Sequence, residues 1–375
     1  MKFFAQSIWI GWLLTGIAAA HDLGVANSRL ATHPYDFTVR PPTKMVLHFS
    51  ESRLALASTA LAEPAMPAAT NGNAGAFVWQ GKELAAAFAP FGRKVKTHWD
   101  SDFFYVESEG MPAHNMMIGI QNWQQQVPLP QPYSAANAWR LPLKPAISAH
   151  PISTRNNLFR GAIAIAVNGV PIFNALNNRG EDSFKIGELD EWGGHCGRAD
   201  DYHYHVAPFH LQEIAGRDQP IAVALDGFPV YGLTEPDGSV VGALDEFNGH
   251  FDRSGRYHYH GTKTYPYING GIKGVVDVAN GQIEPQPRAF PIRPALDPLR
   301  GAVITGFESR GTNQFHLVYA LSGRTNIIDY LMKDDGTVVF TFSNSGGSST
   351  SEVYRRQSDR FEPRPNGREG RRPPP

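Results

Sequence analysis

The chain has 375 residues, of which 18% are charged, and its formal net charge at pH 7 is -1. Its 37 glycines and 29 prolines suit a loop-rich β protein and argue against a helical bundle. The near-neutral charge and the absence of a recognisable nucleic-acid motif argue against a nucleic-acid partner. A single cysteine excludes an internal disulfide bond.

The first 20 residues predict a secretory signal peptide. Lys2 is their only charge, an apolar run extends over residues 3–17, and alanines at 18–20 form a small-residue cleavage site. We expect cleavage after Ala20 and a periplasmic or secreted mature protein. No later stretch reaches the ~20 apolar residues that a membrane-spanning helix needs, so no span is expected after cleavage.

Residues 21–99 are expected to form an N-terminal, β-containing region. Proline and glycine interrupt it often, so its elements are short. The expected elements in chain order are a strand at 44–49, a linker at 61–75, a helix at 82–88 that ends before Pro90, a strand at 103–106 and an apolar element at 116–123. Six prolines in residues 127–151 then favour an extended wrapping segment over regular structure.

A repeated hairpin follows, because residues 161–173 align with residues 219–231. Alternating apolar residues flank Asn168-Gly169 in one copy and Asp226-Gly227 in the other. Such dipeptides predict hairpins with type I′ turns. The second strand of each hairpin contains a proline, Pro171 or Pro229, which cannot donate a ladder hydrogen bond, so we expect edge strands.

A second repeat carries histidines. Residues 189–205 and 244–260 are identical at ten of 17 positions, and each ends in Tyr-His-Tyr-His with a further histidine upstream. Because side chains alternate between the faces of a strand, the two histidines of each tetrapeptide would share one face and the tyrosines would line the other. Imidazole is the commonest ligand for copper, zinc and iron. The predicted metal ligands are His195, His203, His205, His250, His258 and His260, in one composite site or two separate sites.

Each histidine repeat also contains an acidic pair, Asp190-Glu191 or Asp245-Glu246. These carboxylates are candidate general acids or bases, or candidate partners that orient the metal ligands. The alternative is that they cap the following turns. Cys196 is replaced by Phe251 in the second copy, which indicates that the chemistry of the site does not need sulfur.

With these motifs the chain resembles the YHYH-domain family, bacterial secreted or periplasmic proteins named for the tetrapeptide. The resemblance runs from about Asp100 to Gly274 and takes in residues 107–114, the repeated hairpin, both histidine repeats and residues 264–271. It implies an exported location and a general architecture, and it implies no activity. His114, in the first of these segments, is a candidate for an extra metal ligand.

The predicted fold is mainly β, with hairpin-plus-loop units packed as a pseudo-two-fold pair. The predicted organisation is a YHYH domain at 100–283 with repeat units at about 161–210 and 219–265, a Pro-rich linker at 284–298, a C-terminal β segment at 299–346 and a disordered Arg/Pro-rich tail at 347–375.

Three classes of function fit this sequence. The leading hypothesis is an exported protein that binds copper, zinc or iron through the duplicated histidines. The second is a metal-dependent periplasmic enzyme, a hydrolase or an oxidoreductase, in which a bound ion activates water or oxygen. The third is a sugar-binding, peptide-binding or structural module without a metal, in which tyrosines and histidines line a groove.

The signal peptide gives a direct prediction. Intact mass and N-terminal sequencing of the exported protein should give a chain that starts at His21, because the alanines at 18–20 suit signal peptidase. Export of a chain that still starts at Met1 would contradict it.

Overall fold

The computed structural model describes residues 78–355 of the chain. Strands dominate this range, and the prediction of a mainly β fold is confirmed. The predicted signal peptide, the strand at 44–49, the linker at 61–75 and the tail beyond residue 355 lie outside the described residues. Between residues 78 and 355, no helix has both the length and the apolar character to cross a membrane.

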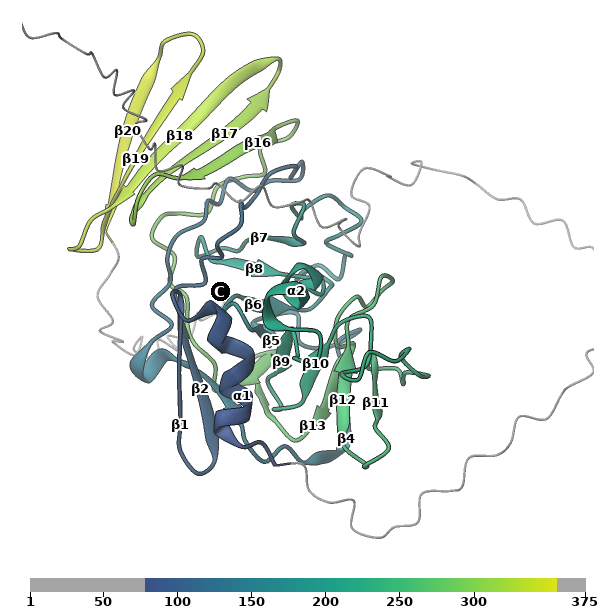
Figure 1. The fold of residues 1–375 in the computed structure, drawn as a ribbon. Helices are drawn as coiled ribbons and strands as arrows, with labels where there is room; N and C mark the ends of the chain where they lie inside the picture. The colour runs from purple at the N-terminus through teal and green to yellow at the C-terminus, as the bar shows by residue number, and fades with distance from the viewer. Residues whose placement is uncertain (1–77, 356–375) are drawn as a thin grey trace, which may run out of the picture. The chain divides into compact units, whose positions relative to one another are not determined.

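The two repeat units together build an eight-stranded sheet with the order β11-β12-β10-β9-β5-β6-β8-β7 (Figure 1). The units meet where β5 pairs antiparallel with β9. Outward from this pair, each unit places its first, second, fourth and third strands in turn. The bounds are Ala162–Ala166 (β5), Pro171–Phe173 (β6), Gly194–Cys196 (β7), Tyr202–Tyr204 (β8), Ala222–Ala224 (β9), Pro229–Tyr231 (β10), Gly249–Phe251 (β11) and Tyr257–His260 (β12). A pseudo-two-fold relation between the units stays a prediction.

The central strands β5 and β9 are buried at every residue. Their alanines and branched aliphatic side chains suit strands that are covered on both faces. The tips of the two hairpins are anchored by long-range hydrogen bonds. Ser108 Oγ donates to the Gly169 carbonyl at 2.6 Å, and Trp79 Nε1 donates to the Gly227 carbonyl at 2.8 Å.

The repeated hairpins form, but without the predicted type I′ turn. The amide of Gly169 donates to the carbonyl of Ala166 at 2.8 Å, and only the glycine, with φ of 79°, has a positive φ in this turn. This is a type I turn closed by a left-handed glycine, which adds a third residue to the loop. The second hairpin does the same with Gly227, whose φ is 90°.

The prediction that β6 and β10 are edge strands is wrong. β6 lies between β5 and β8, and β10 lies between β9 and β12. Pro171 and Pro229 are each the first residue of their strand, where a missing N–H group is tolerated.

The N-terminal part of the described chain forms a helix and small sheets. The predicted helix at 82–88 is present as α1, and the predicted strand at 103–106 lies within β2. Residues 116–123 form neither helix nor strand. The expectation of an irregular segment at 127–151 is wrong in part, because β3 and the start of β4 form there. The bounds are Gly81–Phe88 (α1), Ala89–Phe91 (η1), Val95–Trp99 (β1), Phe103–Ser108 (β2), Ala135–Asn137 (η2), Trp139–Pro142 (β3) and Ile147–Ser153 (β4).

β1, β2 and β3 form one antiparallel sheet, and β4 pairs with β13. A 3-10 helix and a short helix follow the first histidine strand, and three short strands follow the second. Their bounds are Phe209–Leu211 (η3), Gln212–Ala215 (α2), Gly271–Gly274 (β13), Asp277–Ala279 (β14) and Gln282–Glu284 (β15).

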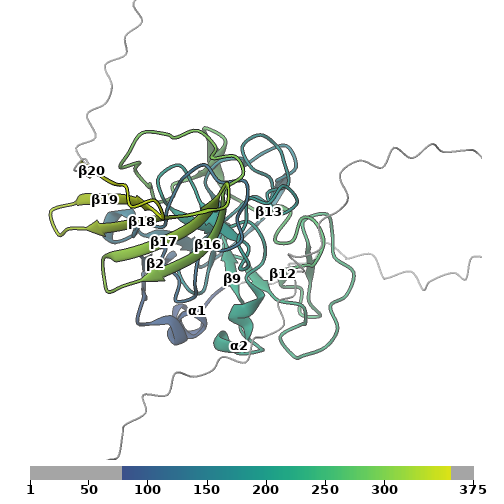
Figure 2. The same ribbon diagram turned by 90° about the horizontal axis from the view of Figure 1, so that it is seen from above.

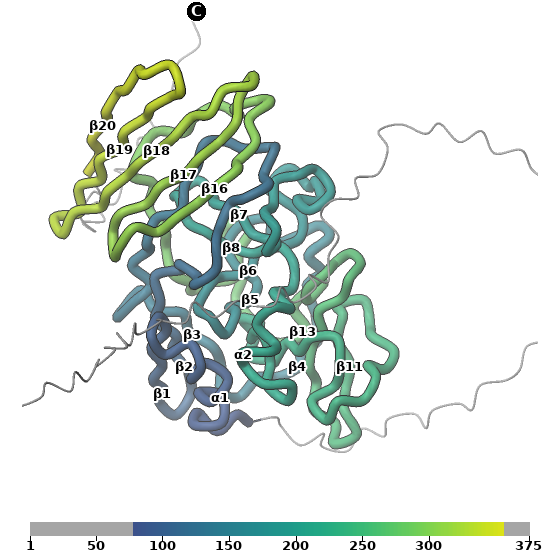
Figure 3. The backbone as a smooth tube through the Cα atoms, turned by 45° about the horizontal axis from the view of Figure 1, so that its top comes forward, coloured from purple at the N-terminus to yellow at the C-terminus, as the bar shows by residue number. Residues whose placement is uncertain are grey.

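The C-terminal residues form a five-stranded antiparallel meander, whose strands run side by side in Figures 2 and 3. The prediction of disorder from residue 347 is wrong for residues 349–355, because they pair with β19 along its whole length. These residues are mostly polar and exposed, so it is the pairing with β19, and not burial of apolar side chains, that makes them a strand. The bounds are Val303–Ser309 (β16), Gln314–Leu321 (β17), Arg324–Met332 (β18), Thr337–Asn344 (β19) and Ser349–Arg355 (β20).

A buried ion pair connects the proline-rich segment to the loop before β8, and its arginine also contacts the C-terminal meander. Arg293 donates to both carboxylate oxygens of Asp200, at 2.8 and 3.1 Å, and both side chains are at most 5% exposed. The same guanidinium lies 4.8 Å from the ring centre of Phe340 in β19. Asp200 also accepts the amide of Val127 at 2.9 Å. Residues 284–298 are therefore packed against the fold and are not a free linker.

We expect Arg293→Ala to lower the free energy of unfolding by about 3–5 kcal/mol, because it leaves the buried Asp200 carboxylate without its cation. Arg310→Ala is the matched control. Arg310 pairs with Glu308, and both side chains are about half exposed, so its loss should cost less than ~1 kcal/mol. Urea unfolding of both variants measures the difference, and equal stabilities would contradict the prediction.

Candidate functional site

Two antiparallel hairpins bring the predicted histidines together. In the β7–β8 pair His195 lies opposite His203, and in the β11–β12 pair His250 lies opposite His258. The third histidine of each repeat follows two residues later and therefore returns to the same face of the strand. The prediction that each Tyr-His-Tyr-His segment is extended is confirmed in full for β12, whereas β8 ends at Tyr204, one residue before His205.

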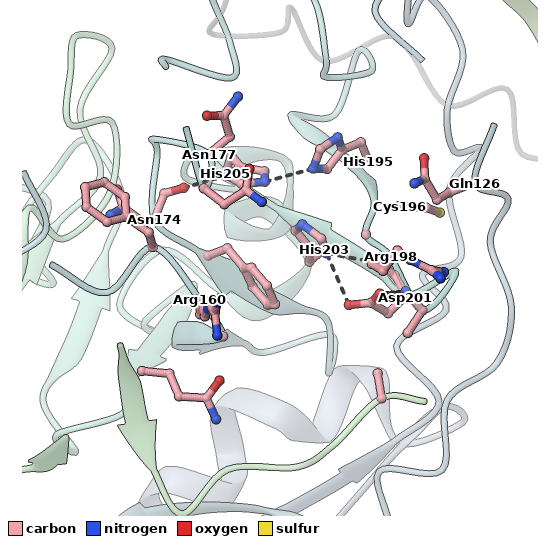
Figure 4. Close-up of a pocket in the computed structure, with 18 of the residues that line it drawn as sticks. Gln126, Arg160, Asn174, Asn177, His195, Cys196, Arg198, Asp201, His203 and His205 are labelled. Atoms are coloured by element: carbon pink, nitrogen blue, oxygen red, sulfur yellow. Dashed lines mark hydrogen bonds and ion pairs between the residues drawn. The ribbon is translucent and has the colours of Figure 1, made fainter. Parts of the chain in front are cut away.

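The six histidines form two separate groups. We call His195, His203 and His205 site A, and His250, His258 and His260 with Glu235 site B. Within each site the ligand atoms lie within 4.8 Å of one another. The Nε2 atoms of His195 and His205 are 3.0 Å apart, and those of His250 and His258 are also 3.0 Å apart. Figure 4 shows how His195, His203 and His205 face one another in site A.

Backbone carbonyls orient the imidazoles. In site A, Nδ1 of His203 bonds the carbonyl of Asp201 at 2.9 Å, and Nδ1 of His205 bonds the carbonyl of Asn174. In site B, Nδ1 of His260 bonds the carbonyl of Gly232 at 2.9 Å. Because a carbonyl only accepts hydrogen bonds, the proton of each neutral ring is on Nδ1 and the lone pair of Nε2 is free. Metal-bound histidines characteristically donate their other ring nitrogen in this way.

Burial favours the neutral form of four of the six rings by lowering their pKa values. It lowers the pKa of His205 to about 3, with a further contribution from the neighbouring His203. It lowers the pKa of His260 to about 4 and lowers the pKa of His195 well below its usual value. The pKa of His258 is also lowered by burial. At neutral pH these imidazoles therefore present lone pairs, the form that binds a metal ion.

The geometry fits a metal ion. Two nitrogens bound to one tetrahedral zinc are roughly 3.3 Å apart, since each Zn–N bond is about 2.0–2.1 Å. The 3.0 Å separations in the two sites are close to this spacing. In each pair one imidazole nitrogen can donate a hydrogen bond to the other, and a cation between them would take the place of that proton. Both sites therefore have the donor atoms and the spacing for a transition-metal ion.

Glu235 is the site residue that the sequence reasoning missed. Its carboxylate lies 3.0 Å from Nε2 of His250 and 3.1 Å from Nε2 of His258. The hairpin alignment stops at Tyr231, four residues before Glu235. Extending the alignment would have paired Glu235 with Asn177 and shown an acid in only one copy.

The tyrosines occupy the opposite face of the histidine strands, as predicted. The hydroxyl of Tyr202 donates to Asp190 at 2.7 Å, and that of Tyr257 donates to Asp245 at 3.0 Å. A Cβ on Gly194 would lie 2.5 Å from the Tyr202 hydroxyl. Glycine at this position thus leaves room for the tyrosine to reach its carboxylate.

The acidic pairs lie apart from the imidazole nitrogens. Asp190 accepts the amides of Trp192 and Gly194 at 2.9 and 3.0 Å, and Asp245 accepts the amide of Phe247 at 2.9 Å. These contacts cap the turns before β7 and β11. Glu191 and Glu246 are exposed. The general acid–base role considered for these four residues stays a prediction.

His114 and Cys196 are not part of either group of ligands. Nε2 of His114 lies 2.7 Å from the Tyr204 hydroxyl, on the tyrosine face of β8, and its ring stacks on Trp192. Cys196 is buried, and burial raises the pKa of its thiol well above its usual value. It is therefore held as a neutral thiol.

Site A opens into a cavity of about 720 Å³. All three site A histidines line it, together with side-chain amides and aromatic rings from several loops (Figure 4). The ring of Phe173 stacks on His203 with centres 3.9 Å apart and forms part of the wall. None of the site B ligands lines this cavity.

Comparison with known proteins gives one match. Residues 138–239 match the model of a protein family described as YHYH protein. The matched range contains site A and Glu235 and ends before the three histidines of site B. No curated protein and no solved structure shows significant similarity to the chain.

The position of Asp190 predicts a structural effect. Asp190→Ala leaves the Tyr202 hydroxyl, two buried backbone amides and one partly buried amide without an acceptor, and it should lower the free energy of unfolding by at least ~3 kcal/mol. The exposed neighbour provides the control, because Glu191→Ala should change stability by less than ~0.5 kcal/mol. Chemical unfolding tests both. An Asp190→Ala variant that is as stable as the wild type would contradict the structural role.

Proposed function

The chain is a YHYH-domain family protein, and we propose that it is exported and binds transition-metal ions at site A and site B. The export part rests on the predicted signal peptide at residues 1–20. The metal-binding part rests on the histidine geometry. Copper, zinc and iron are the proposed metals, since imidazole accepts each of them.

One observation carries the proposal: imidazole Nε2 atoms converge while Nδ1 atoms are bonded to backbone carbonyls. In site A, the carbonyls of Asp201 and Asn174 hold His203 and His205 in this orientation. Core histidines bond separate polar partners with their two nitrogens. In each site, one ring nitrogen from each of three histidines instead lies within 4.8 Å of the others, and Nε2 of His205 is 3.0 Å from that of His195.

The tyrosines weigh against the alternative of a sugar-binding or peptide-binding groove. Tyr202, Tyr204, Tyr257 and Tyr259 are each at most 2% exposed. Three of their hydroxyls bond buried or partly buried carboxylates, those of Asp190, Asp245 and Asp226. These tyrosines therefore offer no surface to a ligand.

A metal-dependent enzyme is the second candidate function, and the cavity at site A is the observation that favours it. Catalytic zinc sites typically combine three protein ligands with one open position. The chain supplies three histidines there and a volume that suits a small molecule.

We expect the purified protein to bind about two equivalents of zinc or copper per chain. His203→Ala/His205→Ala removes two ligands of site A, and His258→Ala/His260→Ala removes two ligands of site B, so each variant should retain one equivalent. His98→Ala/His150→Ala is the matched control, because both side chains are exposed and outside the two sites. It should retain both equivalents. Elemental analysis after dialysis against a metal buffer gives the stoichiometry.

A wild-type protein that stays free of metal after titration with zinc, copper and iron would overturn the proposal. Loss of one equivalent in the exposed-histidine control would do the same, because the ions would then be bound adventitiously. Circular dichroism of each variant confirms that the fold is retained.

A further inference from the structure

The two sites differ in the side chain at one equivalent position of the chain, residue 177 in the first unit and residue 235 in the second. Asn177 and Glu235 begin the same type of turn. In both turns the carbonyl of this first residue accepts the amide of the third residue after it, and its own amide donates to the carbonyl of the fourth. Gly180 N donates to the Asn177 carbonyl at 2.9 Å, and Gly238 N donates to the Glu235 carbonyl at 2.9 Å. Asn177 N then donates to the Glu181 carbonyl, and Glu235 N donates to the Ser239 carbonyl. The main chain is thus alike, and only the side chain differs.

The two side chains are used differently. The carboxylate of Glu235 lies within 3.5 Å of Nε2 of all three site B histidines. The Oδ1 atom of Asn177 accepts the amides of Arg179 and Glu181, and its Nδ2 atom donates to the carboxylates of Glu181 and Glu188. Asn177 therefore has no free donor atom for a metal at site A. Site B has four protein ligands, and site A has three.

The charges differ as well. An ion at site B has the Glu235 carboxylate beside it. In site A no carboxylate belongs to the group of converging ligand atoms. Glu188 is buried and paired with Arg179 at 2.6 Å, and Asp201 lies 3.5 Å from Nδ1 of His203, the nitrogen that is bonded to a backbone carbonyl. An ion at site A would thus have no carboxylate among its ligands. Arg160 and Arg198, both exposed, also line the cavity in front of it.

From the open position, the cavity and the charge, we infer that the metal at site A binds an external small anion directly, whereas the metal at site B is fully enclosed by protein ligands. The inference rests on the proposed metal binding. The cavity of about 720 Å³ holds a small organic molecule, and its four arginines outnumber its three acids, Glu188, Asp201 and Glu284. The ligand class is therefore a small organic anion with a carboxylate or similar group, and inorganic azide is a suitable probe.

The test uses the full-length protein loaded with cobalt(II), which occupies zinc sites and has a visible spectrum that responds to coordination. The His258→Ala/His260→Ala variant carries metal only at site A. Azide should shift the visible spectrum of this variant, and the shift should reach a plateau as the azide concentration rises. The His203→Ala/His205→Ala variant carries metal only at site B, and the same azide concentrations should leave its spectrum unchanged.

Exchange of the distinguishing residue provides matched variants. Asn177→Glu, added to the His258→Ala/His260→Ala variant, gives site A the carboxylate that site B has. It should weaken azide binding by at least ~10-fold, a difference of 1.4 kcal/mol. Glu235→Asn, added to the His203→Ala/His205→Ala variant, removes the carboxylate from site B and should produce a spectral response to azide. The second exchange keeps the test valid if a third acid near Glu181 and Glu188 destabilises the first variant.

The outcomes separate the two proposals. Absence of cobalt, zinc and copper binding contradicts metal binding itself. Metal binding at both sites with no azide response at site A overturns the present inference and leaves the proposed function intact. Equal azide affinity at the two sites, or an Asn177→Glu variant that binds azide as well as its parent, also overturns it.

Discussion

The register of the two histidine hairpins is the constraint on which both sites depend. His195 lies opposite His203, and His250 lies opposite His258. Because side chains alternate along a strand, a slip of one residue in β8 or β12 would put tyrosines in place of the histidines of the Tyr-His-Tyr-His segment. The contacts on the tyrosine face oppose such a slip: Tyr202 bonds Asp190, and Tyr257 bonds Asp245. The hydrogen bonds between tyrosines and carboxylates on one face of the strands thus help to keep the histidines on the other face.

A second set of contacts orients the rings once the register is set. The carbonyl acceptors of His203 and His205 belong to Asp201 and Asn174, residues that are far apart in the sequence. Asn174 is itself held by side-chain hydrogen bonds to the carbonyls of Thr154 and Asn157. The folded backbone therefore imposes both the tautomer and the direction of the free lone pairs. Ligands held by their surroundings in this way are preorganised for an ion.

Local patterns in the sequence predicted local structure well. The His-x-His spacing predicted strands, and the apolar runs beside Asn168-Gly169 predicted a hairpin, because both features depend on neighbours in the chain. The prolines of β6 and β10 misled the assignment of edges, since a proline at the start of a strand blocks no ladder bond. The arginine-rich composition likewise hid β20, which is stabilised by its pairing with β19.

The fourth ligand of site B and the cavity of site A could not be read from spacing alone. Glu235 comes 15 residues before His250 and stands in a turn without a histidine. The cavity is lined by loops from residues 117 to 291, which only the tertiary fold brings together. Local sequence patterns extend over only a few residues. They therefore cannot show which distant segments the tertiary fold brings together.

The difference at positions 177 and 235 shows how two sites on one scaffold can diverge. The turn is closed by main-chain hydrogen bonds in both units, so its side chain varies without loss of the turn. Glu235 would also compensate for the charge of an ion bound by the proposed site, whereas the Glu188 carboxylate is already paired with Arg179. An ion that binds only the folded chain would stabilise it. In the proposed metal-bound state, the site with four protein ligands would couple metal binding most directly to stability, and the site with three would leave a position for an exchangeable ligand.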